Sequence, residues 1–159
     1  TLGVRKPWPS CGEIDIMEYY QIGGEPHILA NAAWGTDKKN VAKWDSAKLP
    51  YSKFISKDPE WANKFHVWRM DWDQEFIRLY LDDELLNEIP LSATVNGSEG
   101  NHINPFKTPH YVLLNLAMGS NGGKIDETLL PMRYEIDYVR VYQKEKKPYE
   151  AFHPGGKLF

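Results

Sequence analysis

Residues 12–20 read Gly12-Glu13-Ile14-Asp15-Ile16-Met17-Glu18-Tyr19-Tyr20, and acidic side chains alternate with aliphatic ones through the first part of this segment. In an extended strand successive side chains point to opposite faces, so Glu13 and Asp15 share one face while Ile14 and Ile16 share the other. The alternation predicts a β-strand whose aliphatic face lies on a hydrophobic core.

A β-bulge is expected within this strand, because Glu18 is out of phase with Glu13 and Asp15 by one residue. If Met17 is the extra residue of the bulge, Glu18 returns to the face of the other two acids. Three neighbouring carboxylates repel one another, so at least one of them should keep its proton to an unusually high pH, at a cost in stability. This indicates a functional groove, although the acids also fit a solvated strand face or a calcium site.

The rest of the chain is also dominated by short segments rich in Ile, Val, Tyr, Phe and Trp, bounded by Gly, Pro, Asn and Asp. They predict an all-β antiparallel sandwich or barrel with strands at residues 12–20, 27–34, 65–72, 76–81, 110–118 and 133–142. A hairpin turn is expected at Asp82-Asp83. Residues 112–117 are apolar at both odd and even positions, with Asn115 as the one polar interruption. This pattern predicts a strand that is buried on both faces. Residues 35–64 and 87–109 contain several prolines and predict long loops, with a helical turn near residues 59–63.

The amino-acid composition limits the kinds of molecule that the protein is expected to bind. The 159 residues fit one domain, and 19 Lys and Arg against 22 Asp and Glu give a net charge of −3, without the basic excess of a nucleic-acid-binding surface. No apolar run approaches the roughly 18 residues of a membrane span. Six Trp and nine Tyr exceed what a core of this size needs, which favours a ligand that stacks on aromatic rings, such as a sugar.

The acid pattern suits one chemistry in particular. Retaining glycosidases use two carboxyl groups about 5–5.5 Å apart, one as nucleophile and one as proton donor. Glu13 and Glu18 could meet that separation across Asp15. Asp15 would then orient the nucleophile and help to keep the two Glu residues in different protonation states.

The segment from Glu13 to Glu18, with Trp8-Pro9 just upstream, resembles the catalytic strand of glycoside hydrolase family 16, in the bulged form seen in laminarinases and several algal-galactan hydrolases. The similarity continues, in the family's order, through Phe65-His66-x-Trp68, Ile77-x-Leu79-Tyr80-x-Asp82, residues 109–123 and residues 134–142.

This resemblance implies a jelly-roll β-sandwich that cleaves a β-linked polysaccharide internally, with retention of configuration and no cofactor. By position, Glu13 is the nucleophile, Asp15 its helper and Glu18 the acid/base. Trp8 would stack on the sugar at the cleavage point, with packing at the sandwich edge as the alternative. Trp34 is the next candidate platform, with core packing as an equal alternative. Asp137 matches an acidic position near which the family often holds a structural calcium.

The resemblance also bears on domain organisation. Family members of this type carry several strands before the catalytic strand, whereas twelve residues precede Glu13 here. We therefore expect residues 1–143 to be part of a single catalytic domain, with residues 144–159 as a C-terminal tail. The missing N-terminal strands are an expected partner.

The expected substrate is a β-1,3-glucan or a mixed β-1,3/1,4-glucan. Two alternatives stay open: the same mechanism on a galactan or a host O-glycan, and a carbohydrate-binding jelly roll without catalysis. Polysaccharides are too large to enter cells readily, so a secreted, periplasmic or cell-surface location is expected.

Overall fold

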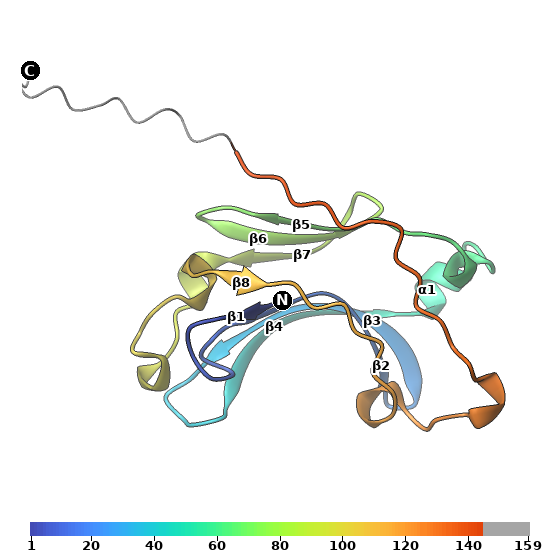
Figure 1. Ribbon diagram of the computed structural model, residues 1–159, viewed down its shortest axis with the longest axis horizontal. Helices are drawn as coiled ribbons and strands as arrows, with labels where there is room; N and C mark the ends of the chain where they lie inside the picture. The colour runs from blue at the N-terminus through green and yellow to red at the C-terminus, as the bar shows by residue number, and fades with distance from the viewer. Residues whose placement is uncertain (145–159) are drawn as a thin grey trace, which may run out of the picture.

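Two antiparallel sheets form the framework of the protein, in a computed structural model that describes residues 1–144 (Figure 1). The larger sheet has the strand order β4-β3-β2-β1-β8, with bounds β1 Leu2–Gly3, β2 Glu13–Ile22, β3 Glu25–Gly35, β4 Ala42–Pro50 and β8 His110–Tyr111. The smaller sheet has the order β5-β6-β7, with bounds Trp68–Trp72, Phe76–Leu81 and Glu84–Pro90. The all-β antiparallel sandwich predicted from the sequence is confirmed.

Helical structure is confined to short turns. The α-helix α1 spans Ser52–Ile55, and the 3-10 turns are η1 Trp61–Asn63, η2 Leu91–Ala93, η3 Ser98–Gly100, η4 Pro105–Lys107, η5 Ser120–Gly122 and η6 Glu127–Leu129. The helical turn expected near residues 59–63 is confirmed by η1. Within residues 1–144, no helix has the length and apolar character needed to cross a membrane.

The main core lies between the two sheets. Its buried residues come from both sheets and from the loop before β8: Ile14, Ala30, Ala32, Trp34, Ile77, Leu79, Ile89, Leu91 and Phe106. Each fully buried aliphatic or aromatic side chain of this kind contributes about 1.5–3 kcal/mol. The inward face of β2 is therefore fixed by Ile14, which is fully buried, as the aliphatic alternation predicts.

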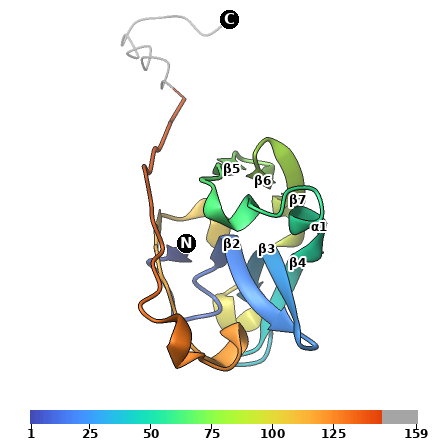
Figure 2. The same ribbon diagram turned by 90° about the vertical axis from the view of Figure 1, so that its right-hand side faces the viewer.

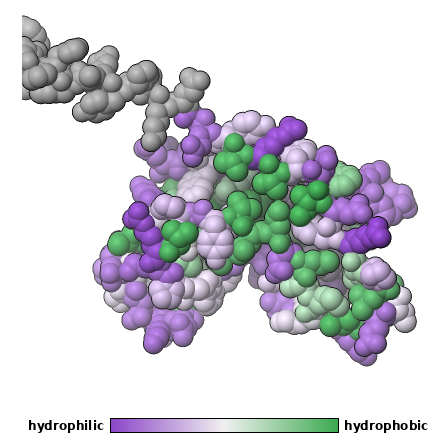
Figure 3. All heavy atoms as spheres, viewed as in Figure 1, coloured by the Kyte–Doolittle hydropathy of each residue, from purple (hydrophilic) through white to green (hydrophobic). Residues whose placement is uncertain are grey.

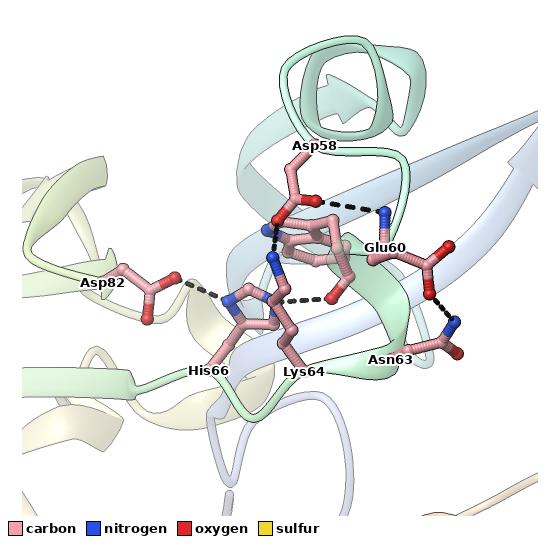
Figure 4. Close-up of polar contacts among 7 residues, drawn as sticks. Asp58, Glu60, Asn63, Lys64, His66 and Asp82 are labelled. Carbon is pink, nitrogen blue, oxygen red and sulfur yellow. Dashed lines mark hydrogen bonds and ion pairs between the residues drawn. The ribbon is translucent and has the colours of Figure 1, made fainter.

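The predicted hairpin between β6 and β7 is confirmed. Asp82 and Asp83 both have positive φ, at 47° and 67°, as the turn that suits two twisted strands requires. His66 anchors this turn to the preceding loop (Figure 4): its Nδ1 lies 2.6 Å from Asp82 Oδ2 and its Nε2 lies 2.7 Å from the Trp61 carbonyl oxygen. The Trp61 ring stacks on His66 at 4.2 Å between centroids, so the segment around η1 is held against the smaller sheet.

A buried asparagine holds the loop that precedes β2. Asn96 is 2% exposed; its Oδ1 accepts a hydrogen bond from the Gly35 amide at 2.6 Å, and its Nδ2 donates to the Ser10 carbonyl at 2.9 Å. Three segments distant in sequence therefore meet at one side chain. Because Ser10 follows Trp8 by two residues, this contact fixes the position of Trp8 relative to the end of β3.

Three sequence predictions are wrong in part. Residues 42–50 were expected in a loop but form strand β4. This strand lies at the edge of the larger sheet, where a few apolar side chains are enough to pack its inward side. Residues 112–118 and 133–142 lack regular strand structure, and the side chains of Leu113 and Leu114 are about half exposed. Asn115 is exposed as well. A strand forms only where a neighbour takes its backbone hydrogen bonds, and beyond Tyr111 the described residues supply none. Of the predicted tail at residues 144–159, residues 145–159 lie outside the described residues.

Candidate active site

The predicted bulge in β2 is confirmed by the pairing between β2 and β3. Asp15 lies opposite Asn31 and Glu18 lies opposite Leu29, so two residues of β2 face the single residue Ala30 of β3. Figure 2 shows the two strands side by side, running toward the hairpin that joins them. The bulge therefore adds one residue between the second and third acids.

Strand β3 shows which face the acids occupy, because its pairing with β4 is unbroken. Leu29, Asn31 and Ala33 consequently share one face of β3, and directly paired residues share a face. Their β2 partners are Glu18, Asp15 and Glu13 respectively. All three acids thus lie on the face opposite the buried Ile14, as the sequence predicts.

Two hydrogen bonds orient the outer acids. The Trp8 indole Nε1 donates to Glu13 Oε2 at 2.6 Å, and the Asn31 amide Nδ2 donates to Glu18 Oε2 at 2.9 Å. Trp8 is 43% exposed, so one part of its ring system stays open to a ligand while its N–H holds Glu13.

The central acid has the most perturbed protonation. Burial, with the neighbouring carboxylates of Glu18 and Glu13, raises the pKa of Asp15 from 3.8 to about 8. Burial also raises the pKa of Glu18, with a smaller contribution from Glu13, against hydrogen bonds from Tyr20 and Asn31 that lower it. The expectation that one acid keeps its proton to high pH is confirmed, and that acid is Asp15.

Trp34 is not a sugar platform in this structure. It belongs to the face of β3 that carries Ala30 and Ala32, is 3% exposed and packs in the core between the sheets. Of the two alternatives for Trp34, packing in the core is therefore the one observed. The spacing of two residues between Ala30, Ala32 and Trp34 is the sequence signal that places Trp34 on the same face as the two alanines.

Asp137 lies in a segment without regular secondary structure, and it is exposed. Within residues 1–144, no group of three or more His, Cys, Asp or Glu side chains is arranged to hold a metal ion. The described residues therefore do not confirm the expected calcium site at Asp137.

Two residues on the acid face were missed by the sequence reasoning. Asn31 faces Asp15, and Trp44 of β4 lies in the row that runs Glu13–Ala33–Trp44 across three strands. Trp44 is 46% exposed, and two strand spacings put its backbone about 10 Å from that of Glu13. Both depend on cross-strand register, which a single sequence does not provide.

The family model described as "Glycosyl hydrolases family 16" matches residues 3–140. The chain belongs to this family. Among curated relatives, the beta-glucanase of Rhodothermus marinus is 30% identical over 142 residues, covering 86% of this chain and 46% of the relative. A keratan-sulfate endo-1,4-beta-galactosidase of Sphingobacterium multivorum is 31% identical over 140 residues, covering 86% of this chain and 29% of the relative.

A solved family 16 structure supports the fold. LamAcat from Zobellia galactanivorans superposes with a TM-score of 0.54 at 30% identity, covering 76% of this chain and 42% of that one. The predicted jelly-roll class is thereby confirmed for this family 16 chain. The chain spans less than half the length of each of these three proteins.

Proposed function

We propose that this chain carries the catalytic strand of an endo-acting, retaining glycoside hydrolase that cleaves β-1,3-glucan or mixed β-1,3/1,4-glucan. The observation that carries the proposal is the bulge in β2, which sets Glu13 and Glu18 on one face with Asp15 between them. We expect the carboxyl groups of Glu13 and Glu18 to lie about 5–5.5 Å apart, as direct attack requires.

In the proposed reaction, a Glu13 oxygen attacks the anomeric carbon while Glu18 gives its proton to the departing glycosidic oxygen. This breaks the glycosidic bond and forms a covalent glycosyl-enzyme. Glu18 then removes a proton from a water molecule, whose oxygen displaces Glu13 from the anomeric carbon. Because Trp8 Nε1 bonds Oε2 of Glu13, the other carboxylate oxygen is the one free to attack.

Asp15 has a separate part in this scheme. With its pKa raised to about 8, Asp15 is neutral at neutral pH and does not add a third negative charge between the two Glu residues. A neutral carboxyl can also donate a hydrogen bond, which an ionised one cannot. The protonated Asp15 therefore leaves the nucleophile as the ionised member of the group.

The sugar subsites in this proposal are built on exposed tryptophans. Trp8 adjoins Glu13, and Trp44 lies two strands away on the same face. A pyranose presents an apolar face that stacks on an aromatic ring. We therefore assign Trp8 to the sugar at the cleavage point and Trp44 to a sugar farther along the chain.

A galactan is the second candidate substrate, favoured by the 31% identity with the keratan-sulfate endo-1,4-beta-galactosidase. The catalytic acids would act in the same way on either polymer. Product release from laminarin, mixed-linkage glucan, agarose and keratan sulfate separates the candidates, since our proposal expects the first two to be cleaved fastest.

We also propose that further strands of the same domain cover the apolar surface left open here. The exposed residues include Val112, Leu113, Leu114, Leu116 and Met118, and Figure 3 shows hydrophobic atoms gathered in the middle of the face that it views. Apolar patches of this kind mark interaction sites. Because the polymers are large, we place the protein outside the cytoplasm, as a secreted, periplasmic or cell-surface enzyme.

The variants Glu13→Gln and Glu18→Gln test the proposal. Each should keep the circular-dichroism spectrum of the native protein and lose at least about 10²–10⁴-fold in hydrolysis, because Gln neither attacks nor donates a proton. Glu25→Gln, which changes an exposed acid at the start of β3, is the matched control and should keep full activity. Activity retained in both test variants would overturn the assignment, and laminarin binding by an inactive native protein would favour the binding-module alternative.

A further inference from the structure

Tyr20 lies on the same face of β2 as Glu18. The two residues pair with His27 and Leu29, which are two residues apart in β3 and so share one face. Two residues along a strand are about 7 Å apart, a distance that the long side chain of tyrosine can span. The Tyr20 hydroxyl forms a hydrogen bond with the Glu18 side chain. Tyr20 therefore adjoins the proposed acid/base on the side away from Asp15.

The turn η5 covers this end of β2. It packs against the strand, and Figures 1 and 2 show the orange turn nearest β2 beside the hairpin that joins β2 to β3. Gly123, which follows η5, has a φ of 91° and lies so close to the strand that a Cβ atom there would be 3.0 Å from Gln21 Cγ. Within the turn, the Asn121 side chain forms a hydrogen bond with the Tyr20 hydroxyl. A segment distant in sequence thus reaches Tyr20.

The chemistry of the three side chains sets the direction of these hydrogen bonds. An ionised carboxylate can only accept, so the Tyr20 hydroxyl donates to Glu18 and its oxygen is left to accept from the Asn121 amide. Burial raises the pKa of Tyr20, against the hydrogen bond from Asn121 that lowers it, and the neighbouring carboxylate of Glu18 raises it further. The phenol therefore keeps its proton at neutral pH and remains the donor.

Two donors act on Glu18 against the effect of burial. Burial raises the pKa of Glu18, and the hydrogen bonds from Tyr20 and Asn31 lower it. A hydrogen bond to an ionised carboxylate is stronger than one to a neutral group, but a protonated carboxyl still has an oxygen that accepts. Tyr20 can therefore hold the Glu18 carboxyl group in both protonation states, and it favours the ionised state.

We propose that Tyr20 is a positioning residue, whose hydroxyl is held by Asn121 and fixes the orientation of the Glu18 carboxyl group. This role rests on the proposed function, in which Glu18 gives up a proton in the first step and takes one from water in the second. Between the two steps the carboxyl group must keep its direction while its charge changes. A donor that stays bound in both states meets this requirement without touching the substrate.

Other titratable groups surround the pair. Those of the same sheet that act on it or face it are Glu13, Asp15, the amino group of Thr1, His27, which pairs with Tyr20, and Lys48 of β4, which pairs with Leu29. The turn η5 has the sequence Ser-Asn-Gly and carries no charge, and Lys124 comes two residues after it. Removing only the Tyr20 hydroxyl leaves all these charges in place, so the change isolates the hydrogen bond.

Carboxyl ¹³C NMR titration of Glu18 in the native protein, Tyr20→Phe, Asn121→Ala and the double variant tests the proposal. Tyr20→Phe should raise the titration midpoint of Glu18 by about 0.5–1 pH unit, because the ionised form loses a donor. Asn121→Ala should raise it by less, and should have no effect where residue 20 is already Phe, since Asn121 acts through the hydroxyl. An unchanged midpoint in Tyr20→Phe, or an equal effect of Asn121→Ala in both backgrounds, overturns the proposal.

Tyr19→Phe is the matched control. Tyr19 is next to Tyr20 in sequence but pairs with the buried Ile28, so it points to the other face of the sheet, where Gln21 Nε2 donates to its hydroxyl at 3.4 Å. Removing this hydroxyl should leave the midpoint of Glu18 in place. A shift as large as that of Tyr20→Phe would also overturn the proposal, because it would reflect a general effect of losing a phenol.

A measurement on the native protein covers the case in which the variants do not fold. The ¹³Cζ signal of Tyr20 should shift with the titration of Glu18, whereas that of Tyr19 should not, and a Tyr20 signal that does not follow Glu18 overturns the proposal. The NMR results need no turnover, so they are independent of the hydrolysis test with Glu13→Gln and Glu18→Gln.

A pH profile of hydrolysis tests the part that the proposal gives Tyr20 in the reaction. Hydrolysis should fall at high pH as Glu18 loses its proton, so the alkaline limb of the profile should move upward in Tyr20→Phe by the same amount as the Glu18 midpoint. An alkaline limb that stays in place would overturn this part of the proposal.

Discussion

Replacing Asp15 by Asn should stabilise the folded protein at neutral pH. In the unfolded chain Asp15 loses its proton near pH 3.8, whereas in the folded protein burial and the carboxylates of Glu18 and Glu13 keep the proton bound up to about pH 8. The folded state therefore binds more protons in this window, and the free energy of unfolding falls as the pH rises from about 4 to about 8. Asn cannot ionise, so the variant escapes this loss.

The size of the effect follows from the two pKa values. The interval from 3.8 to 7 is 3.2 units, and each unit corresponds to about 1.36 kcal/mol, so the variant should gain roughly 4 kcal/mol at pH 7. At pH 4 the unfolded chain is still largely protonated, and the expected gain is below about 1 kcal/mol.

Urea unfolding of the native protein and of Asp15→Asn at several pH values between 4 and 8.5 measures this difference. Glu25→Gln removes an exposed acid and should stay within about 0.5 kcal/mol of the native protein throughout. A gain that is equal at pH 4 and pH 7, or a variant less stable than the native protein at pH 7, would refute the reasoning. Hydrolysis should fall in the same variant, since the proposed mechanism gives Asp15 a part in the reaction.

Three further predictions concern Trp44 on the face of the acids, the buried Asn96 and the bulge in β2. Trp44→Ala should raise the KM for long oligosaccharides about tenfold, corresponding to a stacking contribution near 1.4 kcal/mol, and Trp44→Phe should restore most of it in steady-state assays. Asn96→Ala should lower the free energy of unfolding by about 2–4 kcal/mol in urea titrations, because two buried hydrogen bonds are lost and their backbone partners stay buried. Deleting Met17 should leave Glu18 paired with Leu29 and keep the protein folded with measurable activity. Inserting one Ala after Met17 should instead turn Glu18 away from the other acids and abolish hydrolysis. Amide NMR contacts between β2 and β3 report the strand register in both variants.

Much of the fold could be predicted from local pattern. The out-of-phase Glu18 predicts the bulge because the side-chain period of a strand is two, and Asp82-Asp83 predicts the hairpin because short polar residues tolerate positive φ. Strand β4 was missed because its Lys, Asp and Ser side chains resemble those of a loop. Residues 112–117 are predicted to be a buried strand because they are apolar at both odd and even positions, but burial depends on partner strands that the described residues do not supply.

The site divides in a similar way. Glu13, Asp15 and Glu18 are close in sequence, so the geometry of one strand is sufficient to place them on one face. Asn31 and Trp44 come from other strands, and only register shows that they face the acids. The raised pKa of Asp15 depends on desolvation. The spacing of the acids in the sequence predicts the direction of this pKa shift but not its size.

The position of β4 at the edge of the larger sheet has a consequence for how substrate preference can change. Its outward residues Trp44, Ser46 and Lys48 share the face of the acids, while its inward side contributes Ala47 to the core. Exchanging those three side chains should therefore leave the core packing and the three acids of β2 undisturbed. For the proposed enzyme, we therefore expect changes in one border strand to alter the preference for a polymer while the proposed chemistry stays constant.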